Sequence, residues 1–246
     1  MNKPIRCSMQ LSRVWAHWIM KIRSFEFIIL AIAFVCLSGM VASGLTTSFD
    51  KIINAHVKDV QGNEKLDILM IAVTSLGDLS TLVIIGIILT IIRRTRKMGL
   101  IFLISIVFIS ISIIYLKPVI GRQAPPNEFQ TSLVFPKYFV LEDDSVAPFA
   151  RGDSYPSNHV AIATALAFVV GFQINKKSRI GGLLICCFPA LIGITKLYLM
   201  QHYFTDIIGG FLLGLIISII TSNVMHLDQP FLMSRFKGKE DMDTQQ

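Results

Sequence analysis

Charged side chains are scarce in this chain, at 16% of its 246 residues, whereas a soluble globular domain usually carries about 25%. Hydrophobic residues make up 53% of the sequence, and the mean hydropathy is +0.62. This shortage of charge, together with the surplus of apolar residues, excludes an ordinary soluble domain and points to one domain embedded in a membrane.

Cysteine is also rare, with four residues at positions 7, 36, 186 and 187. None has the spacing of a metal site, and none lies in the loops that we expect to face outward. The sequence therefore predicts no disulfide framework, and we expect chemistry that uses no metal and no cofactor.

The net charge of +7 comes from basic clusters that bound apolar segments. Residues 93–97 follow one long apolar run, and residues 176–179 follow another. Basic clusters in such positions are topology signals, whereas a nucleic-acid-binding protein carries a basic face on a soluble fold. We therefore expect a membrane protein with no nucleic-acid partner.

Six apolar segments approach the roughly 20 residues that a helix needs to cross a bilayer. They cover roughly residues 27–45, 68–92, 98–116, 160–174, 181–199 and 205–222. The fourth is shorter than usual for a span. The predicted fold class is thus all-α, a polytopic bundle of six transmembrane helices with a long outer loop, residues 118–158, between helices 3 and 4.

The distribution of lysine and arginine gives the expected organisation. Residues 1–24 form a cytoplasmic basic leader, either amphipathic or disordered; residues 25–225 form the six-span domain; residues 226–246 form a flexible cytoplasmic tail. With the N-terminus in the cytoplasm, most basic residues lie inside. We therefore expect a multi-pass protein of a bacterial inner membrane, with both termini cytoplasmic and the loops after the first, third and fifth spans on the periplasmic face.

Three polar clusters fall at the outer ends of these spans, although the span count did not use them. The third cluster contains Lys196, His202 and Asp206. His202 and Asp206 are four residues apart and would share a helix face. The carboxylate would orient the imidazole and ready it to attack phosphorus, while Lys196 supplies a cation. The alternative, an interfacial histidine beside an aspartate that caps the sixth span, is equally compatible with this cluster alone.

The second cluster is Pro-Ser-Asn-His at residues 156–159, directly before an apolar run. Ser157 or Asn158 would cap a helix there, and the N-terminus of that helix would attract a phosphate. His159, in the first turn, would be the general acid. The plainer alternative is a capped helix with an interfacial histidine.

The first cluster adds two cations, Lys117 and Arg122, before a proline-rich turn. Their plainer role is to reach toward lipid headgroups. Two histidines, three cations and a helix N-terminus at one membrane face nevertheless meet the needs of phosphoryl transfer, namely positioning, charge neutralisation, a nucleophile and an acid.

At this point the sequence resembles the PAP2 (type 2 phosphatidic acid phosphatase) superfamily. That signature has three parts: Lys-x6-Arg-Pro, Pro-Ser-Gly-His and Ser-Arg-x5-His-x3-Asp. The matching residues are Lys117, Pro125, Pro156, Ser157, His159, His202 and Asp206, with Thr195 and Lys196 in the Ser-Arg positions. The resemblance covers roughly residues 25–225.

The resemblance implies a mechanism. His202 would form a phosphohistidine, Asp206 would support it, and His159 would protonate the leaving group. The phosphate would be held by Lys117, Lys196, Ser157 and the backbone near Asn158.

Three departures from the signature affect the cations and the turn. Ala124 stands in place of the motif arginine, and Lys196 keeps the charge of the other arginine without its bidentate geometry. Asn158 replaces glycine, which is tolerable because asparagine enters the left-handed region more easily than most residues. We hypothesise that Arg122, or otherwise Arg151, takes the place of the missing arginine.

The leading hypothesis is a membrane lipid phosphatase that acts on undecaprenyl diphosphate, phosphatidylglycerol phosphate or phosphatidic acid. The alternative within the family is a phosphotransferase from undecaprenyl diphosphate to lipid A, because Ala124 and the Arg151–Pro156 segment resemble that branch. A lipid transporter is the alternative of another class. It would use ionisable groups near the bilayer midplane, where Asp78 is the candidate. The lipid, the oligomeric state and the role of Glu142–Asp144 stay open.

Overall fold

The computed structural model describes residues 21–126, 129, 131, 133 and 152–228. Most of the expected leader, nearly all of the expected tail, Arg151 and the acidic residues 142–144 lie outside the described residues.

The described part of the chain is helical and contains no named strand. The helices are α2 (Phe25–Ala42), α3 (Thr47–Lys58), α4 (Glu64–Thr74), η1 (Ser75–Gly77), α5 (Leu79–Ile91), α6 (Arg96–Ile120), α7 (Asn158–Lys177), α8 (Arg179–Cys186), α9 (Phe188–Tyr198) and α10 (Phe204–Val224). The predicted all-α class is confirmed.

The described helices support the predicted multi-pass membrane bundle. Five of them are long and apolar enough to cross a bilayer: α2, α6, α7, α8 with α9, and α10. The sixth span is a bent pair in which residues 64–77 and α5 meet at 48°. The span predicted over residues 160–174 is longer than expected: α7 has 20 residues, because polar residues at both ends continue the helix.

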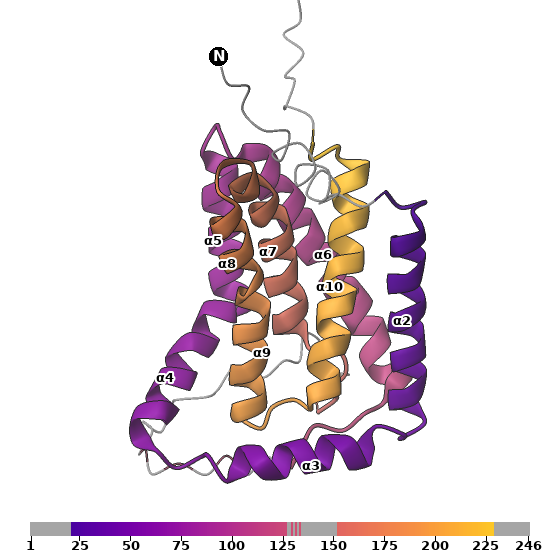
Figure 1. Cartoon of the computed structure of the whole chain (residues 1–246), viewed down its shortest axis with the longest axis vertical. Helices are drawn as coiled ribbons and strands as arrows, with labels where there is room; N and C mark the ends of the chain where they lie inside the picture. The colour runs from indigo at the N-terminus through magenta and orange to yellow at the C-terminus, as the bar shows by residue number, and fades with distance from the viewer. Residues whose placement is uncertain (1–20, 127–128, 130, 132, 134–151, 229–246) are drawn as a thin grey trace, which may run out of the picture.

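The bundle is built around α7, which lies between α6, α9 and α10 (Figure 1) and is the most buried of the described spans. Small residues allow the close packing. Gly210 and Gly214 let α10 approach α7 so closely that a Cβ at either position would collide with the carbonyl oxygens of Ser157 and Ala161. The start of α7 and the start of α10 are therefore in near backbone contact.

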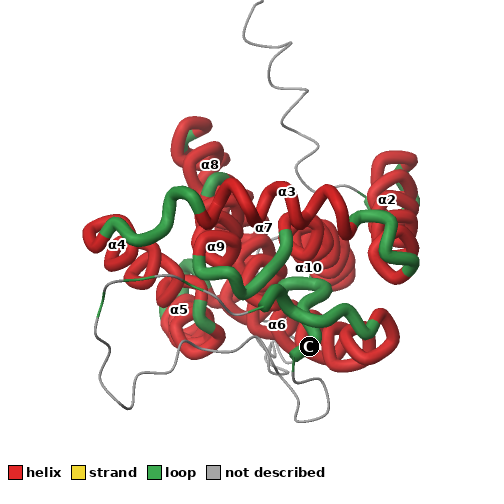
Figure 2. The backbone as a smooth tube through the Cα atoms, turned by 90° about the horizontal axis from the view of Figure 1, so that it is seen from below, coloured by secondary structure: helices red, strands yellow, loops and turns green. Residues whose placement is uncertain are grey.

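Helix α3 lies across the lower end of the bundle instead of along it (Figures 1 and 2), and it contacts α9 and α10. Its inward residues are polar: Asp50 and Asn54 are buried, one helical turn apart. Its outward residues include Phe49 and Ile52, which are 54% and 60% exposed. A helix with an apolar outer face suits the membrane interface. The sequence analysis did not predict this helix.

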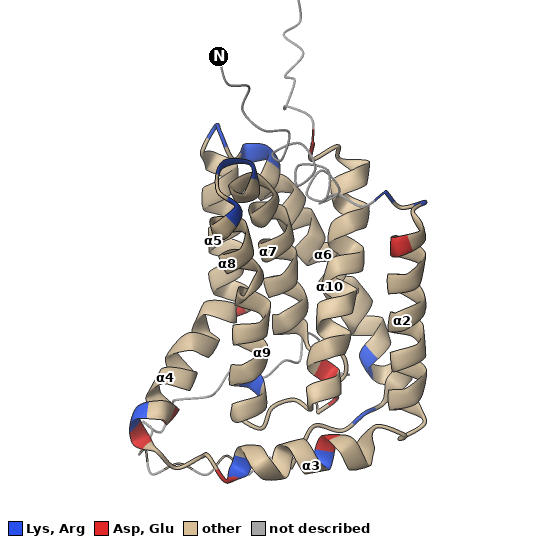
Figure 3. Cartoon of the chain, in the orientation of Figure 1, with Lys and Arg blue, Asp and Glu red and all other residues tan. Residues whose placement is uncertain are grey.

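Charge is distributed differently at the two ends of the bundle (Figure 3). The turns that follow α5 and α7, at the upper end, carry lysine and arginine, whereas the lower end carries charges of both signs. Helix α6 extends to Ile120 and ends at Gly121, whose φ of 62° lies in the left-handed region that favours glycine. The outer loop therefore starts three residues later than predicted.

Candidate active site

Four helix ends meet at the lower end of the bundle and carry the predicted site residues. The last turns of α6 and α9 supply lysines, the first turns of α7 and α10 supply polar groups, and the turn before α10 supplies a histidine. Each of these side chains is at most 2% exposed: Lys117, Ser157, His159, Lys196, His202 and Asp206. Ionisable groups are almost never so buried without partners, so this concentration marks the candidate active site.

His202 and Asp206 form the first half of the site. The Nδ1 atom of His202 lies 3.6 Å from Oδ2 of Asp206, within ion-pair range and just beyond hydrogen-bond range. The same Oδ2 accepts the Tyr203 amide hydrogen at 2.8 Å, as part of a capping box that begins α10. Asp206 is therefore fixed at the helix start, and Nε2 is the ring nitrogen of His202 that does not face it.

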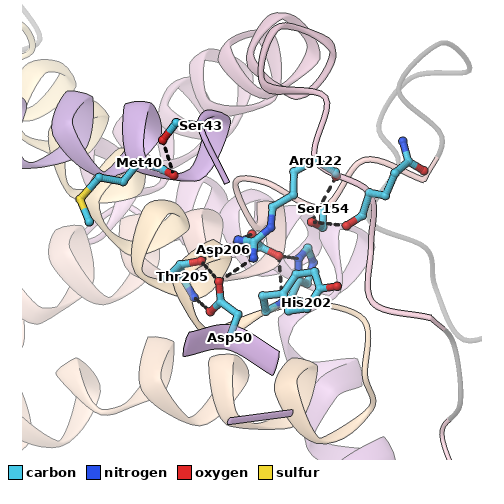
Figure 4. A network of polar contacts seen from close by, with 10 residues as sticks. Met40, Ser43, Asp50, Arg122, Ser154, His202, Thr205 and Asp206 are labelled. Carbon is cyan, nitrogen blue, oxygen red and sulfur yellow. Dashed lines mark hydrogen bonds and ion pairs between the residues drawn. The ribbon is translucent and has the colours of Figure 1, made fainter. Parts of the chain in front are cut away.

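The other oxygen of Asp206 accepts a hydrogen bond from Arg122 (Figure 4). Nη1 of Arg122 donates to Oδ1 of Asp206 at 2.8 Å and to the Thr205 hydroxyl at 2.6 Å. Its guanidinium carbon lies 4.1 Å from the centre of the Tyr203 ring, a cation–π contact. Both hydrogens of Nη1 are thus used by protein oxygens, so phosphate binding by Arg122 stays a prediction that this geometry does not favour.

Asp50, on α3, completes this half of the site. Its Oδ2 accepts from Nη2 of Arg122 at 2.5 Å and from the Thr205 hydroxyl at 2.7 Å. Its Oδ1 accepts the Thr205 amide hydrogen at 3.1 Å, and the side chain is fully buried. The sequence analysis missed Asp50. The available signal was a polar stripe with a spacing of four, Thr46, Asp50 and Asn54, opposite apolar residues.

His159 and Asp78 form the second half of the site. Nε2 of His159 lies 3.5 Å from Oδ1 of Asp78, whose side chain is 20% exposed. Asp78 stands at the break between η1 and α5, so the bend in the second span delivers this carboxylate to the histidine. The sequence analysis had considered Asp78 only for transport.

The N-terminus of α7 lies between these two halves. Ser157, one of the two predicted caps, is the N-cap. Its amide donates to the Asp206 carbonyl at 3.1 Å, which joins the start of α7 to that of α10. Its buried hydroxyl has no hydrogen-bond partner in the described part of the chain. A helix start with such a hydroxyl is suited to an anion.

Two buried lysines lie at this end of the bundle, which also holds the buried carboxylates of Asp50 and Asp206. Nζ of Lys196 donates to Oε1 of Gln201 at 2.8 Å, and Lys117 is equally buried at 1% exposure. Burying an ammonium group costs on the order of several kcal/mol unless a negative group compensates for its charge. Among the described residues, no group of three or more His, Cys, Asp or Glu side chains is arranged to hold a metal ion.

The segment before α7 pairs with the backbone around Arg122. The Ser154 amide donates to the Arg122 carbonyl at 2.8 Å, and the Ala124 amide donates to the Gly152 carbonyl at 2.8 Å. The hydroxyl of Tyr155 lies 2.9 Å from that of Ser38 on α2. Burial raises the pKa of Tyr155 from 10.0 to about 12.

A sequence model of the PAP2 superfamily matches residues 96–229, more than half of the chain, and this range includes all three polar clusters. The chain belongs to the PAP2 superfamily. The resemblance drawn from the motifs is therefore confirmed, and so is the enzyme class that it implied, a PAP2-type lipid phosphatase.

Two PAP2-type proteins are similar over most of the chain. An undecaprenyl-diphosphatase of Sulfolobus acidocaldarius is 27% identical over 213 residues, which cover 86% of this chain and 92% of that protein. The crystal structure of a transmembrane PAP2-type phosphatidylglycerolphosphate phosphatase from Bacillus subtilis matches with a TM-score of 0.65 and 23% identity, over 85% of this chain and 100% of that one. The second similarity supports the fold, a transmembrane PAP2 bundle.

Proposed function

We propose that this PAP2-type lipid phosphatase hydrolyses a lipid phosphate monoester or diphosphate through a phosphohistidine, with water as the final acceptor. The observation that carries the proposal is the buried His202–Asp206 pair, joined through the Ser157 amide to a helix start that is suited to a phosphate. Because a relative that is 27% identical is named undecaprenyl-diphosphatase, undecaprenyl diphosphate is the first substrate to test.

In the first step, Nε2 of His202 attacks the terminal phosphorus and forms an N–P bond. The bond from phosphorus to the leaving oxygen breaks, and His159 gives that oxygen a proton. With a diphosphate substrate, the products of this step are the phosphohistidine and the lipid monophosphate. Asp206, 3.6 Å from Nδ1, stabilises the positive charge that the ring acquires.

Four groups would hold the phosphate during this step. Lys117 and Lys196 supply positive charge, and the Ser157 hydroxyl and the first amides of α7, near Asn158, donate hydrogen bonds. Such groups act because they are fixed where negative charge develops, in a site from which water is largely excluded.

In the second step, a water molecule attacks the phosphorus and gives a proton to His159. The N–P bond then breaks, inorganic phosphate leaves, and His202 returns to its starting state. The same histidine thus acts first as acid and then as base, as reversibility requires.

The site would face the outside of the cell membrane, with both termini in the cytoplasm. The support is the position of the basic clusters that follow α5 and α7, which lie at the end of the bundle opposite the site (Figure 3). Accessibility of a cysteine introduced at Val60, which is exposed between α3 and α4 at the site end, tests this orientation in a variant whose four native cysteines are replaced by serine. Labelling by a membrane-impermeant thiol reagent in intact cells is expected.

The decisive experiment measures phosphate release from undecaprenyl diphosphate by the purified protein in detergent, with wild type compared with His202→Ala. We expect release that needs His202 and needs no lipid acceptor. The same assay is repeated with lipid A present. If little phosphate were released without lipid A, and phosphate were transferred to lipid A when it is present, the protein would be a phosphotransferase. Release that is insensitive to His202→Ala would contradict the mechanism.

A further inference from the structure

Helix α3 brings one carboxylate, that of Asp50, into the buried network around Asp206. In the described contacts, the Asp50 side chain touches neither histidine. We propose that Asp50 is a positioning residue that acts through Arg122 and Thr205 to hold Asp206 in the orientation that the His202 step requires. This inference rests on the proposed function and deepens it.

The contacts form a chain from α3 to the proposed nucleophile. Asp50 binds Nη2 of Arg122 at 2.5 Å, and Nη1 of the same guanidinium binds Oδ1 of Asp206 at 2.8 Å. Thr205, the neighbour of Asp206 in sequence, links Asp50 to Arg122, because its hydroxyl donates to Asp50 and accepts from Arg122. The exposed fractions of the side chains are 0% for both aspartates and 11% for Arg122, so water screens this network only weakly.

The guanidinium is divided between two carboxylates, and this division has a consequence for Asp206. A single arginine facing a single carboxylate favours a bidentate pair that uses both oxygens. Here Asp50 occupies Nη2, so Arg122 reaches only Oδ1 of Asp206. Oδ2 then stays with the Tyr203 amide and on the side of His202.

Without the charge of Asp50, Arg122 would be free to pair with both oxygens of Asp206. The carboxylate would turn away from His202, and its negative charge would be neutralised by the guanidinium instead of by the charged imidazole. The phosphohistidine step would slow, whereas the lysines and the α7 N-terminus, which hold the phosphate, would be unchanged.

The direct test is Asp50→Asn, assayed for phosphate release from undecaprenyl diphosphate by the full-length protein. Asparagine can still accept the Thr205 amide hydrogen, so this hydrogen bond to the first turn of α10 is preserved while the charge is lost. We expect kcat to fall about ten- to hundred-fold, the scale of a small misplacement of a reacting group, with KM close to wild type. An unchanged kcat, or a loss confined to KM, would overturn the proposal.

Asp67→Asn is a matched control. Asp67 is also fully buried at the outer end, where it accepts from the Tyr198 hydroxyl at 2.5 Å and from the Thr131 hydroxyl at 2.6 Å. It has no described contact with Arg122 or Asp206. We expect this variant to keep a kcat close to wild type; an equal loss in both variants would indicate a general effect of removing a buried charge and would overturn the positioning role.

A second measurement separates action through Asp206 from an independent effect. Asp50→Asn is repeated in an Asp206→Asn background, and the phosphohistidine formed in a single turnover is quantified as acid-labile protein-bound phosphate. If Asp50 acts through Asp206, the second substitution adds little to the first. If the fold-losses of the two single variants multiplied in the double variant, the proposal would be overturned. If wild type itself formed no phosphohistidine and released no phosphate, the proposed function would fail instead.

Discussion

The two halves of the candidate site pair a histidine with an aspartate at nearly the same distance, 3.6 Å for His202–Asp206 and 3.5 Å for His159–Asp78, yet they are built differently. Asp206 is fully buried and is held by an arginine and a backbone amide. Asp78 is 20% exposed and stands at the break in a bent span.

This difference matches the two tasks that we assign to the histidines. A nucleophile must hold its position while a bond forms to phosphorus, which favours a rigid and buried support. In the second step His159 takes its proton from the attacking water, so its side of the site must admit that water molecule. The following predictions test this division, beginning with the largest expected effect.

The largest difference between the two halves is expected in the amount of covalent phosphoenzyme that variants of the two histidines form. We expect His202→Ala to abolish acid-labile labelling by a substrate with radioactive phosphate and to lower phosphate release by about 10⁴-fold or more. His159→Ala should still become labelled, because it retains the nucleophile. Labelling that disappears in His159→Ala and persists in His202→Ala would reverse the assignment.

Leaving-group dependence tests the role of His159 as an acid. His159→Ala should lower turnover of a lipid phosphate by about 10²–10⁴-fold, the usual contribution of general acid–base catalysis. When the substrate is an aryl phosphate with an acidic phenol, the leaving oxygen needs little protonation. The same substitution should therefore slow phosphoenzyme formation from this substrate far less. Equal losses on both substrates would contradict the role of acid.

Asp78→Asn tests the looser half of the site. In the described contacts, Asp78 faces His159 and not His202. We therefore expect kcat to fall about tenfold, which is equivalent to raising the activation free energy by about 1.4 kcal/mol. Thr81→Ala is the matched control, since its hydroxyl donates to the Ser75 carbonyl at the same break. A comparable loss in both variants would mean that the bend, and not the carboxylate, matters.

The smallest effect is expected at Tyr155, whose contacts lie with α2 and α10 and not with either histidine in the described contacts. Tyr155→Phe removes the contact with Ser38 and should destabilise the fold by about 1 kcal/mol, with kcat nearly unchanged. Since burial raises the pKa of Tyr155 from 10.0 to about 12, wild-type stability should fall as the pH rises through that interval. The phenylalanine variant should lose less stability there, measured as the unfolding midpoint in detergent; equal losses would contradict the assignment.

Most of the membrane bundle could be predicted from the sequence, because long apolar segments report helices directly. The span predicted over residues 98–116 corresponds to α6, and that over 205–222 to α10. Helix α3 was missed because its twelve residues mix polar and apolar side chains and are too few to span a bilayer. Its amphipathic spacing was the signal that could have predicted it.

The site was predictable where its geometry is local. His202 and Asp206 are four residues apart, and the structure brings them together, but His202 lies in the turn before α10 and not on the predicted shared helix face. Asp50 and Thr205 are 155 residues apart in sequence, and Asp78 meets His159 only because a span bends. Such contacts depend on tertiary packing, which composition and periodicity do not encode. For the same reason, the sequence analysis assigned Arg122 to phosphate, whereas its described hydrogen-bond partners are two carboxylates and a threonine.

The near backbone contact between α7 and α10 ties two parts of the catalytic centre together. Gly210 and Gly214 leave no space for a Cβ between these helices. The separation of His159, on α7, from Asp206, on α10, is therefore set by backbone packing as well as by side-chain contacts. Alanine at either glycine would push the two helices apart, and it would alter the spacing of the centre without changing any of its polar groups.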